Sequence, residues 1–181
     1  MQTHALATAA VLVALAACNR SEHGQNLAMT DEATTAAEAN AVEAAVIDTA
    51  FVMDAVKGDN GEVAIGQLAQ AKGQSQAVKD FGKLLVSDHG AHKQELASLA
   101  QSANVPVTDE ATDEAKANLE KLTGLSGAEF DKQFKTTMVE DHQKDIERYE
   151  KQANSSDPQT AALAQKTLPT LRKHLEVAKG L

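Results

Sequence analysis

The feature that most constrains this chain is a long stripe of apolar side chains at helical spacing within residues 76–102. Two histidines interrupt the stripe, whose members recur at steps of three and four: Val78, Phe81, Leu85, His89, His92, Leu96 and Leu99. This is the period of a helix that buries one face. A helix of this length in water depends on packing of that face, so the stripe predicts a bundle of helices.

Three further stretches have the same period, at residues 49–72, 126–153 and 157–180. A shorter one covers residues 109–123, after a proline-containing segment that a helix cannot simply continue through. Aromatic residues make up only 3% of the chain and Trp is absent, which suits closely packed helices. Residues 48–181 are therefore predicted to form an all-α, antiparallel four-helix bundle with a short helix connecting its second and third long helices.

Two helix starts are visible as local signals. Ser126 precedes a helical stretch and Glu129 follows three residues later, the spacing of a capping box. Asp157 and Pro158 occupy an N-cap and a first helical position, where each type is favoured.

The N-terminal residues predict where the protein is located in the cell rather than how it folds. Residues 5–17 are uncharged and mostly apolar, too short to span a bilayer but suited to a signal peptide over residues 1–17. The stretch ends in Leu15-Ala16-Ala17-Cys18, which resembles a bacterial lipobox, so Cys18 is predicted to carry a lipid. Asn19 then favours the outer membrane, facing the periplasm. Residues 18–47 have few large apolar side chains and are predicted to be a flexible tether.

The net charge of the chain limits the classes of partner that it can bind. The formal net charge of −9 disfavours nucleic acid and anionic lipid as partners, so membrane contact is expected through the N-terminal lipid alone. Cys18 is the only cysteine, which excludes an internal disulfide. No envelope protein partner is identified by any motif.

An internal sequence repeat ends in a histidine in each of its two copies. The segments Phe81–His89 and Phe134–His142 both read Phe-x-x-x-[Leu/Met]-Val-x-Asp-His, which suggests two related helical hairpins. In both segments the histidine falls on the apolar stripe, near the middle of its helix.

Position along the bundle axis adds two more residues, Glu62 and His174, to the candidate site. Glu62, His89 and His142 each lie roughly 20 Å from a helix-connecting turn, and His174 lies somewhat farther from its own. All four are therefore expected near mid-height, where they could bind a transition metal such as Zn, Cu, Ni or Fe. The residues expected around them, as supporting or alternative ligands, are Asp88, His92, Asp141 and Asp145. The alternative is a buried polar layer that fixes helix register without a metal.

At these residues the chain resembles a bacterial family, domain of unknown function 4142. The resemblance rests on the segments around Glu62, on Leu85–His89 and Met138–His142, and on Thr167–Leu171 leading to His174. It implies a ferritin-like bundle and an envelope location, and it implies no reaction. The di-iron centre of ferritin-like bundles is not expected, because no Glu-x-x-His motif is present.

Two functions follow as hypotheses. The first is a lipid-tethered envelope protein that is not an enzyme and acts by interaction or in stress tolerance. The second is a periplasmic metal-binding or redox protein that uses the mid-bundle His/Glu cluster. No catalytic residue is predicted, because the chain has no nucleophile-elbow motif and no glycine-rich phosphate loop.

The lipidation of Cys18 is open to a direct test. Mass spectrometry of the membrane fraction should find a mature chain that begins at a diacylglyceryl-modified Cys18. An unmodified Cys18, or cleavage at another position, would contradict the prediction.

Overall fold

The computed structural model describes residues 47–181, and these residues form five helices and no strand. The four long helices are Thr49–Lys72 (α1), Gln76–Ser102 (α2), Gly127–Ala153 (α4) and Pro158–Gly180 (α5). The short helix α3 spans Asp113–Thr123. The predicted all-α class, with four long helices and a short connecting one, is confirmed.

The predictions for the signal peptide, Cys18 and residues 18–46 lie outside the described residues. Ile47, the last residue of the predicted tether, is buried with 7% of its surface exposed. Within the part of the chain that the structure describes, no helix is long and apolar enough to cross a membrane.

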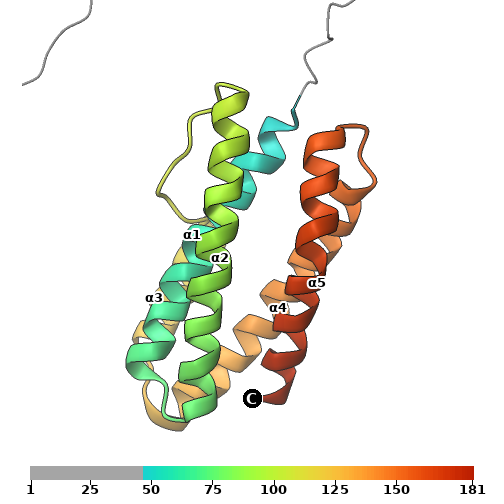
Figure 1. Cartoon of the computed structure of the whole chain (residues 1–181). Helices are drawn as coiled ribbons and strands as arrows, with labels where there is room; N and C mark the ends of the chain where they lie inside the picture. Colours follow the sequence, from blue (N-terminus) through green and yellow to red (C-terminus); the bar gives the residue numbers. More distant parts are fainter. Residues whose placement is uncertain (1–46) are drawn as a thin grey trace, which may run out of the picture. The chain divides into compact units, whose positions relative to one another are not determined.

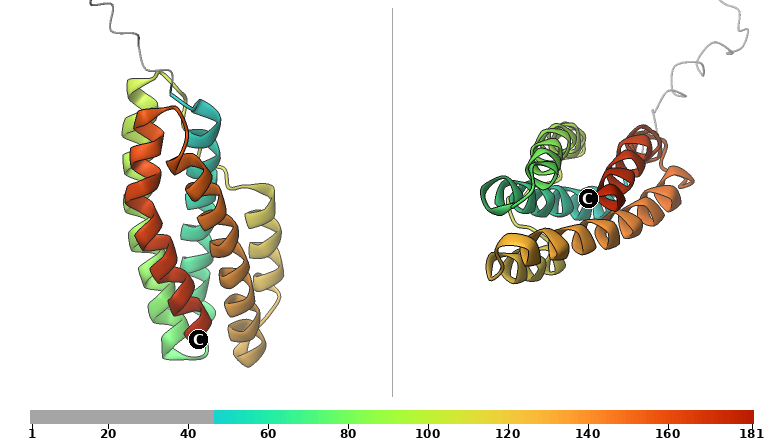
Figure 2. Two further views of the ribbon diagram at one scale, coloured as in Figure 1. Left: turned by 90° about the vertical axis from the view of Figure 1, so that its right-hand side faces the viewer. Right: turned by 90° about the horizontal axis from the view of Figure 1, so that it is seen from below.

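The long helices form two hairpins that lie side by side, α1 with α2 and α4 with α5 (Figure 1). The backbone N–H of Asp48, before α1, donates to Asp157, before α5, at 2.8 Å. The N–H groups of Gln74 and Ser75, between α1 and α2, both donate to Asp131 in the first turns of α4. Helices α1 and α5 therefore run in one direction and α2 and α4 in the other. Helix α3, which flanks α1 and α4 (Figure 2), returns the chain to the end where α4 begins.

Side-chain caps fix most of the helix starts. Asp48 accepts the N–H of Phe51 at the start of α1, and Asp157 is the N-cap of α5 with Pro158 in the first turn, as predicted. The capping box expected at Ser126 is not formed. Ser126 occupies the N-cap position of α4, but its hydroxyl makes no capping hydrogen bond. Gly127 follows with a φ of 59°, so the first position of α4 lacks the helical backbone that a capping box requires.

The two helices of the first hairpin approach closely through a pair of glycines. A Cβ added at Gly82 would lie 2.6 Å from the carbonyl oxygen of Gly66, and one added at Gly66 would lie 2.8 Å from that of Gly82. Any larger residue at either position would push the backbones apart. Gly61 similarly makes room for Ala115 of α3, and α1 continues through Gly58 and Gly61 without a break.

The core is divided into two apolar clusters. The first packs Phe51, Val56, Leu96, Tyr149 and Leu168 with their neighbours, towards the start of α1. The second lies towards the turn between α1 and α2 and contains Ile65, Phe81, Leu85, Phe134 and Met138. Every long helix contributes to both clusters, and each carries a buried polar side chain between them.

The glycine contact yields a prediction for stability. Gly82→Ala should lower the free energy of unfolding by about 1–3 kcal/mol, because the added methyl group overlaps the α1 backbone. Gly90→Ala is the matched control in the same helix, where nothing lies within 4 Å of the added Cβ. It should raise stability by about 0.5–1 kcal/mol through the better helix propensity of alanine. Urea unfolding of both variants tests this, and equal effects would contradict it.

Candidate metal centre

A layer of ionisable side chains separates the two apolar clusters. Three of its members are histidines from α2, α4 and α5, and two are carboxylic acids from α1. The buried members are Asp59, Glu62, His89, His142 and His174, with exposed fractions between 0% and 5%.

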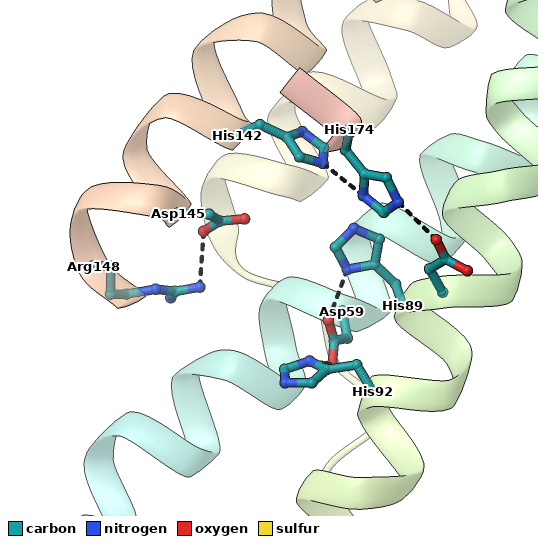
Figure 3. Close-up of polar contacts among 8 residues, drawn as sticks. Asp59, His89, His92, His142, Asp145, Arg148 and His174 are labelled. Carbon is teal, nitrogen blue, oxygen red and sulfur yellow. Dashed lines mark hydrogen bonds and ion pairs between the residues drawn. The ribbon is translucent and has the colours of Figure 1, made fainter. Parts of the chain in front are cut away.

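The three histidines converge in the centre of the bundle (Figure 3). One ring nitrogen of each lies within 4.8 Å of one nitrogen of both others. The ring centroids of His142 and His174 are 5.3 Å apart, and those of His89 and His174 are 5.4 Å apart. Three imidazoles from three helices therefore point their nitrogens into one small volume.

The tautomer of His142 is fixed by a backbone carbonyl. Its Nδ1 lies 2.9 Å from the carbonyl oxygen of Met138, one helical turn earlier. Since a carbonyl oxygen only accepts, Nδ1 carries the proton and Nε2 of the neutral ring has a free lone pair. Burial first, and then the charges of His89 and His174, lower the pKa of His142 to about 3, so the ring is neutral.

His174 is held in the opposite tautomer by a carboxylate. Its Nε2 donates to Asp88 at 2.9 Å, which leaves the lone pair on Nδ1. That Nδ1 lies 3.3 Å from Nε2 of His142. Burial lowers the pKa of His174, and the hydrogen bond to Asp88 only partly offsets the shift. Two unprotonated nitrogens of two neutral rings therefore face each other, and no proton lies between them.

His89 supplies the third nitrogen. Its Nδ1 donates to Asp59 at 2.9 Å, while its Nε2 is buried and has no hydrogen-bond partner. Figure 3 shows this second nitrogen turned towards His142 and His174. Burial lowers the pKa of His89, but Asp59 and Glu62 more than reverse this and raise it to about 9. At neutral pH the positive charge of the layer therefore resides on His89.

Asp59 is the residue that the sequence analysis missed. It is 4% exposed and accepts hydrogen bonds from both His89 and, at 2.8 Å, His92. Burial raises the pKa of Asp59, but the two histidines outweigh burial and the pKa is lowered. A signal was present: the buried face of α1 contains Ala55 and Glu62, and Asp59 fills the gap between them at steps of four and three.

Glu62 is not brought into the histidine group. It is 5% exposed, its Oε2 has no hydrogen-bond partner, and it lines a separate cavity between α1, α3 and α4. Burial raises its pKa to about 8, against the opposing charge of His89 and with a smaller contribution from Asp145 and Asp141. At neutral pH most of this carboxyl is therefore protonated.

The other predicted residues fall into two sets. Asp88 and His92 belong to the histidine layer, through His174 and Asp59 respectively. Asp141 and Asp145 contact no histidine by a hydrogen bond: Asp141 accepts from Asn118 at 3.2 Å, and Asp145 accepts from Arg148 at 2.8 Å. Both line the cavity that Glu62 faces.

Comparison with known proteins agrees with this architecture. The chain is an all-α helical-bundle protein, and residues 32–181 match the family described as Domain of unknown function (DUF4142). It belongs to that family. A solved structure titled "Crystal structure of DUF305 fragment from Deinococcus radiodurans" shares the fold, with a TM-score of 0.65 and 14% sequence identity over 73% of this chain and 92% of that one. No curated protein matches the chain.

The buried Glu62 makes a prediction about pH. Its pKa lies near 8 in the folded protein against an ordinary value of 4.5, so the folded state holds the proton more tightly than the unfolded state. The wild type therefore loses stability at this residue as the pH rises from 4.5 to 8. Glu62→Gln removes that loss, so its stability advantage over the wild type should grow across this window and then level off. Chemical unfolding at pH 5, 7 and 9 measures the difference, and a constant difference would contradict the assignment.

Proposed function

We propose that this bundle binds one transition-metal ion through the inner nitrogens of His89, His142 and His174. The observation that carries the proposal is the arrangement of their outer nitrogens. Each outer nitrogen donates to an acceptor of its own, namely Asp59, the Met138 carbonyl or Asp88. Such outer partners orient histidine ligands in metal proteins, because they fix the tautomer and aim the free lone pair at the metal.

A register-fixing polar layer fits this arrangement less well. In such a layer each inner nitrogen would meet a hydrogen-bond donor, because an unpaired buried polar group costs about 1–3 kcal/mol. Here Nε2 of His142 and Nδ1 of His174 face each other with lone pairs at 3.3 Å. A cation between the three rings satisfies all three nitrogens at once, whereas a hydrogen bond satisfies two of them.

The dimensions suit a small coordination sphere. Zinc bonds to imidazole nitrogen at about 2.0–2.1 Å, so tetrahedral ligands lie roughly 3.4 Å apart. The three nitrogens are within 4.8 Å of one another, so they need approach by little more than 1 Å to close around an ion. A cavity of about 20 Å³ beside His89 and His174 is about the space of one water molecule, which could complete the coordination.

The donor set selects the metal class. Neutral imidazoles suit Zn²⁺ and Cu²⁺, and divalent copper should bind more tightly than zinc at such a site. Asp59 and Asp88 lie behind two of the rings and offset the charge of a divalent ion. The proposed function is therefore metal binding, as in copper or zinc handling or stress tolerance, rather than di-iron chemistry.

The proposed place for this function is the cell envelope. The support is the segment that ends at Cys18, which resembles a lipobox, preceded by an apolar stretch suited to a signal peptide. A lipid on Cys18 would hold the bundle at the membrane surface.

Metal titration of the purified protein tests the proposal. The wild type should bind one equivalent of Cu²⁺ or Zn²⁺, and His142→Ala and His174→Ala should abolish that binding. At a free metal concentration one hundred times Kd, the gain in unfolding free energy should be about 2.7 kcal/mol. Because the ion displaces the proton of His89, affinity should rise about tenfold per pH unit below pH 9.

His92→Ala is the matched control. His92 lies in the same layer and contacts Asp59, but it is not part of the converging group. It should keep one equivalent of bound metal. The proposal would be overturned if neither metal changed the free energy of unfolding of the wild type. It would also be overturned if the His142→Ala variant bound both metals as well as the wild type does.

A further inference from the structure

A second polar cavity lies between α1, α3 and α4, and it shares Gly58, Asp145 and Arg148 with the small cavity beside the histidines. Its volume is about 230 Å³. Five carboxyl groups from these three helices line it, against two basic side chains. The carboxyl groups are those of Asp54, Glu62, Glu114, Asp141 and Asp145, and the basic residues are Lys144 and Arg148.

The two basic side chains form salt bridges with three of the five carboxylates. Lys144 pairs with Glu114, and Arg148 pairs with Asp54 and, at 2.8 Å, with Asp145. Glu62 and Asp141 are left without a basic partner among the described residues. The hydrogen-bond donor that Asp141 has is the amide of Asn118, and Oε2 of Glu62 has no donor.

Exposure increases from Glu62 outwards. Glu62 is 5% exposed, whereas the side chains of Asp54 and Glu114 are 54% and 58% exposed. The cavity is therefore buried at Glu62 and exposed at its other end, where the Lys144–Glu114 and Arg148–Asp54 ion pairs lie. An unpaired carboxyl oxygen of Glu62 therefore lies at the buried end of a cavity that reaches the solvent.

The inner carboxyl groups repel one another. Burial first, then the charges of Glu114 and Asp145, raise the pKa of Asp141 to about 6. Burial also raises the pKa of Asp145, against the effect of Arg148. Together with Glu62, three neighbouring acids hold their protons more tightly than usual. A cation among them would relieve this repulsion.

We propose that this cavity binds a hydrated hard divalent cation of the Mg²⁺ or Mn²⁺ class, through Glu62 and Asp141. Hard cations take oxygen ligands, and Mg²⁺ in proteins keeps several waters beside one or two carboxylates. Among the described residues, three ligand atoms converge within 4.8 Å at the histidine group and at no other place. The carboxylates here are more widely spaced, and 230 Å³ leaves room for about seven waters at roughly 30 Å³ each.

The site is separate in chemistry from the histidine group and does not rest on it. Nitrogen donors favour Cu²⁺ and Zn²⁺, whereas carboxylates and water favour Mg²⁺ and Mn²⁺. Both can therefore be tested in one protein without confusion.

The experiment uses the full chain with His142→Ala, so that the histidine group cannot contribute. Mg²⁺ and Mn²⁺ are titrated calorimetrically to about 10 mM at a constant ionic strength of about 0.15 M, which screens surface charge. One equivalent should bind. Added Glu62→Gln or Asp141→Asn should each lower the affinity at least about tenfold, since each removes a charged ligand.

Glu147→Gln is the matched control, since Glu147 is exposed, lies on α4 and does not line the cavity. It removes the same charge and should leave the affinity unchanged. Asp141→Asn keeps an acceptor for Asn118, so its fold can be verified by its unfolding curve. Absence of binding at 10 mM, or equal loss in Glu147→Gln and Glu62→Gln, would overturn the proposal.

Discussion

The rest of the structure depends on the hydrogen bonds that hold three histidine rings from behind. Burying imidazoles in the middle of a helical bundle is costly unless their polar atoms find partners. Asp59, Asp88 and the Met138 carbonyl partner one nitrogen of each ring and fix its rotation. The apolar clusters on either side then set the spacing of the helices. The inner nitrogens are thus held close together by the fold itself, before any ligand is present.

Burial and charge give the two sides of the layer opposite properties. On the histidine side, His142 and His174 are neutral rings that each keep one nitrogen lone pair, and His89 carries one additional proton and the positive charge. On the carboxyl side, burial favours the protonated form of Glu62, and the opposing charge of His89 does not outweigh it. One side offers nitrogen lone pairs and the other offers oxygen atoms, so the same bundle presents two donor sets to two classes of ion.

The sequence predicted the helices well, because the apolar stripes, caps and prolines are local signals. It also placed His89, His142 and His174 at one height, since helix rise converts residue counts into depth. It did not show which way Glu62 turns, because this depends on the rotation of α1 against α3 and α4. Asp59 was missed since a lone acid between a glycine and an asparagine looks like a surface residue. Its burial could be predicted from the spacing of Ala55 and Glu62, but no local pattern encodes its hydrogen bonds to two histidines of another helix.

The two proposed sites would be coupled through Glu62 and His89. The charge of Glu62 contributes to the raised pKa of His89. Ionised Glu62 therefore strengthens the binding of the His89 proton, which competes with a metal at the histidine group. A divalent cation in the acidic cavity would neutralise that carboxylate and weaken its hold on the His89 proton. It would also repel a second cation across the layer. The proton effect favours occupation of both sites and the repulsion opposes it, so the coupling between them should depend on pH. Above pH 9, where His89 is already deprotonated, the repulsion alone remains.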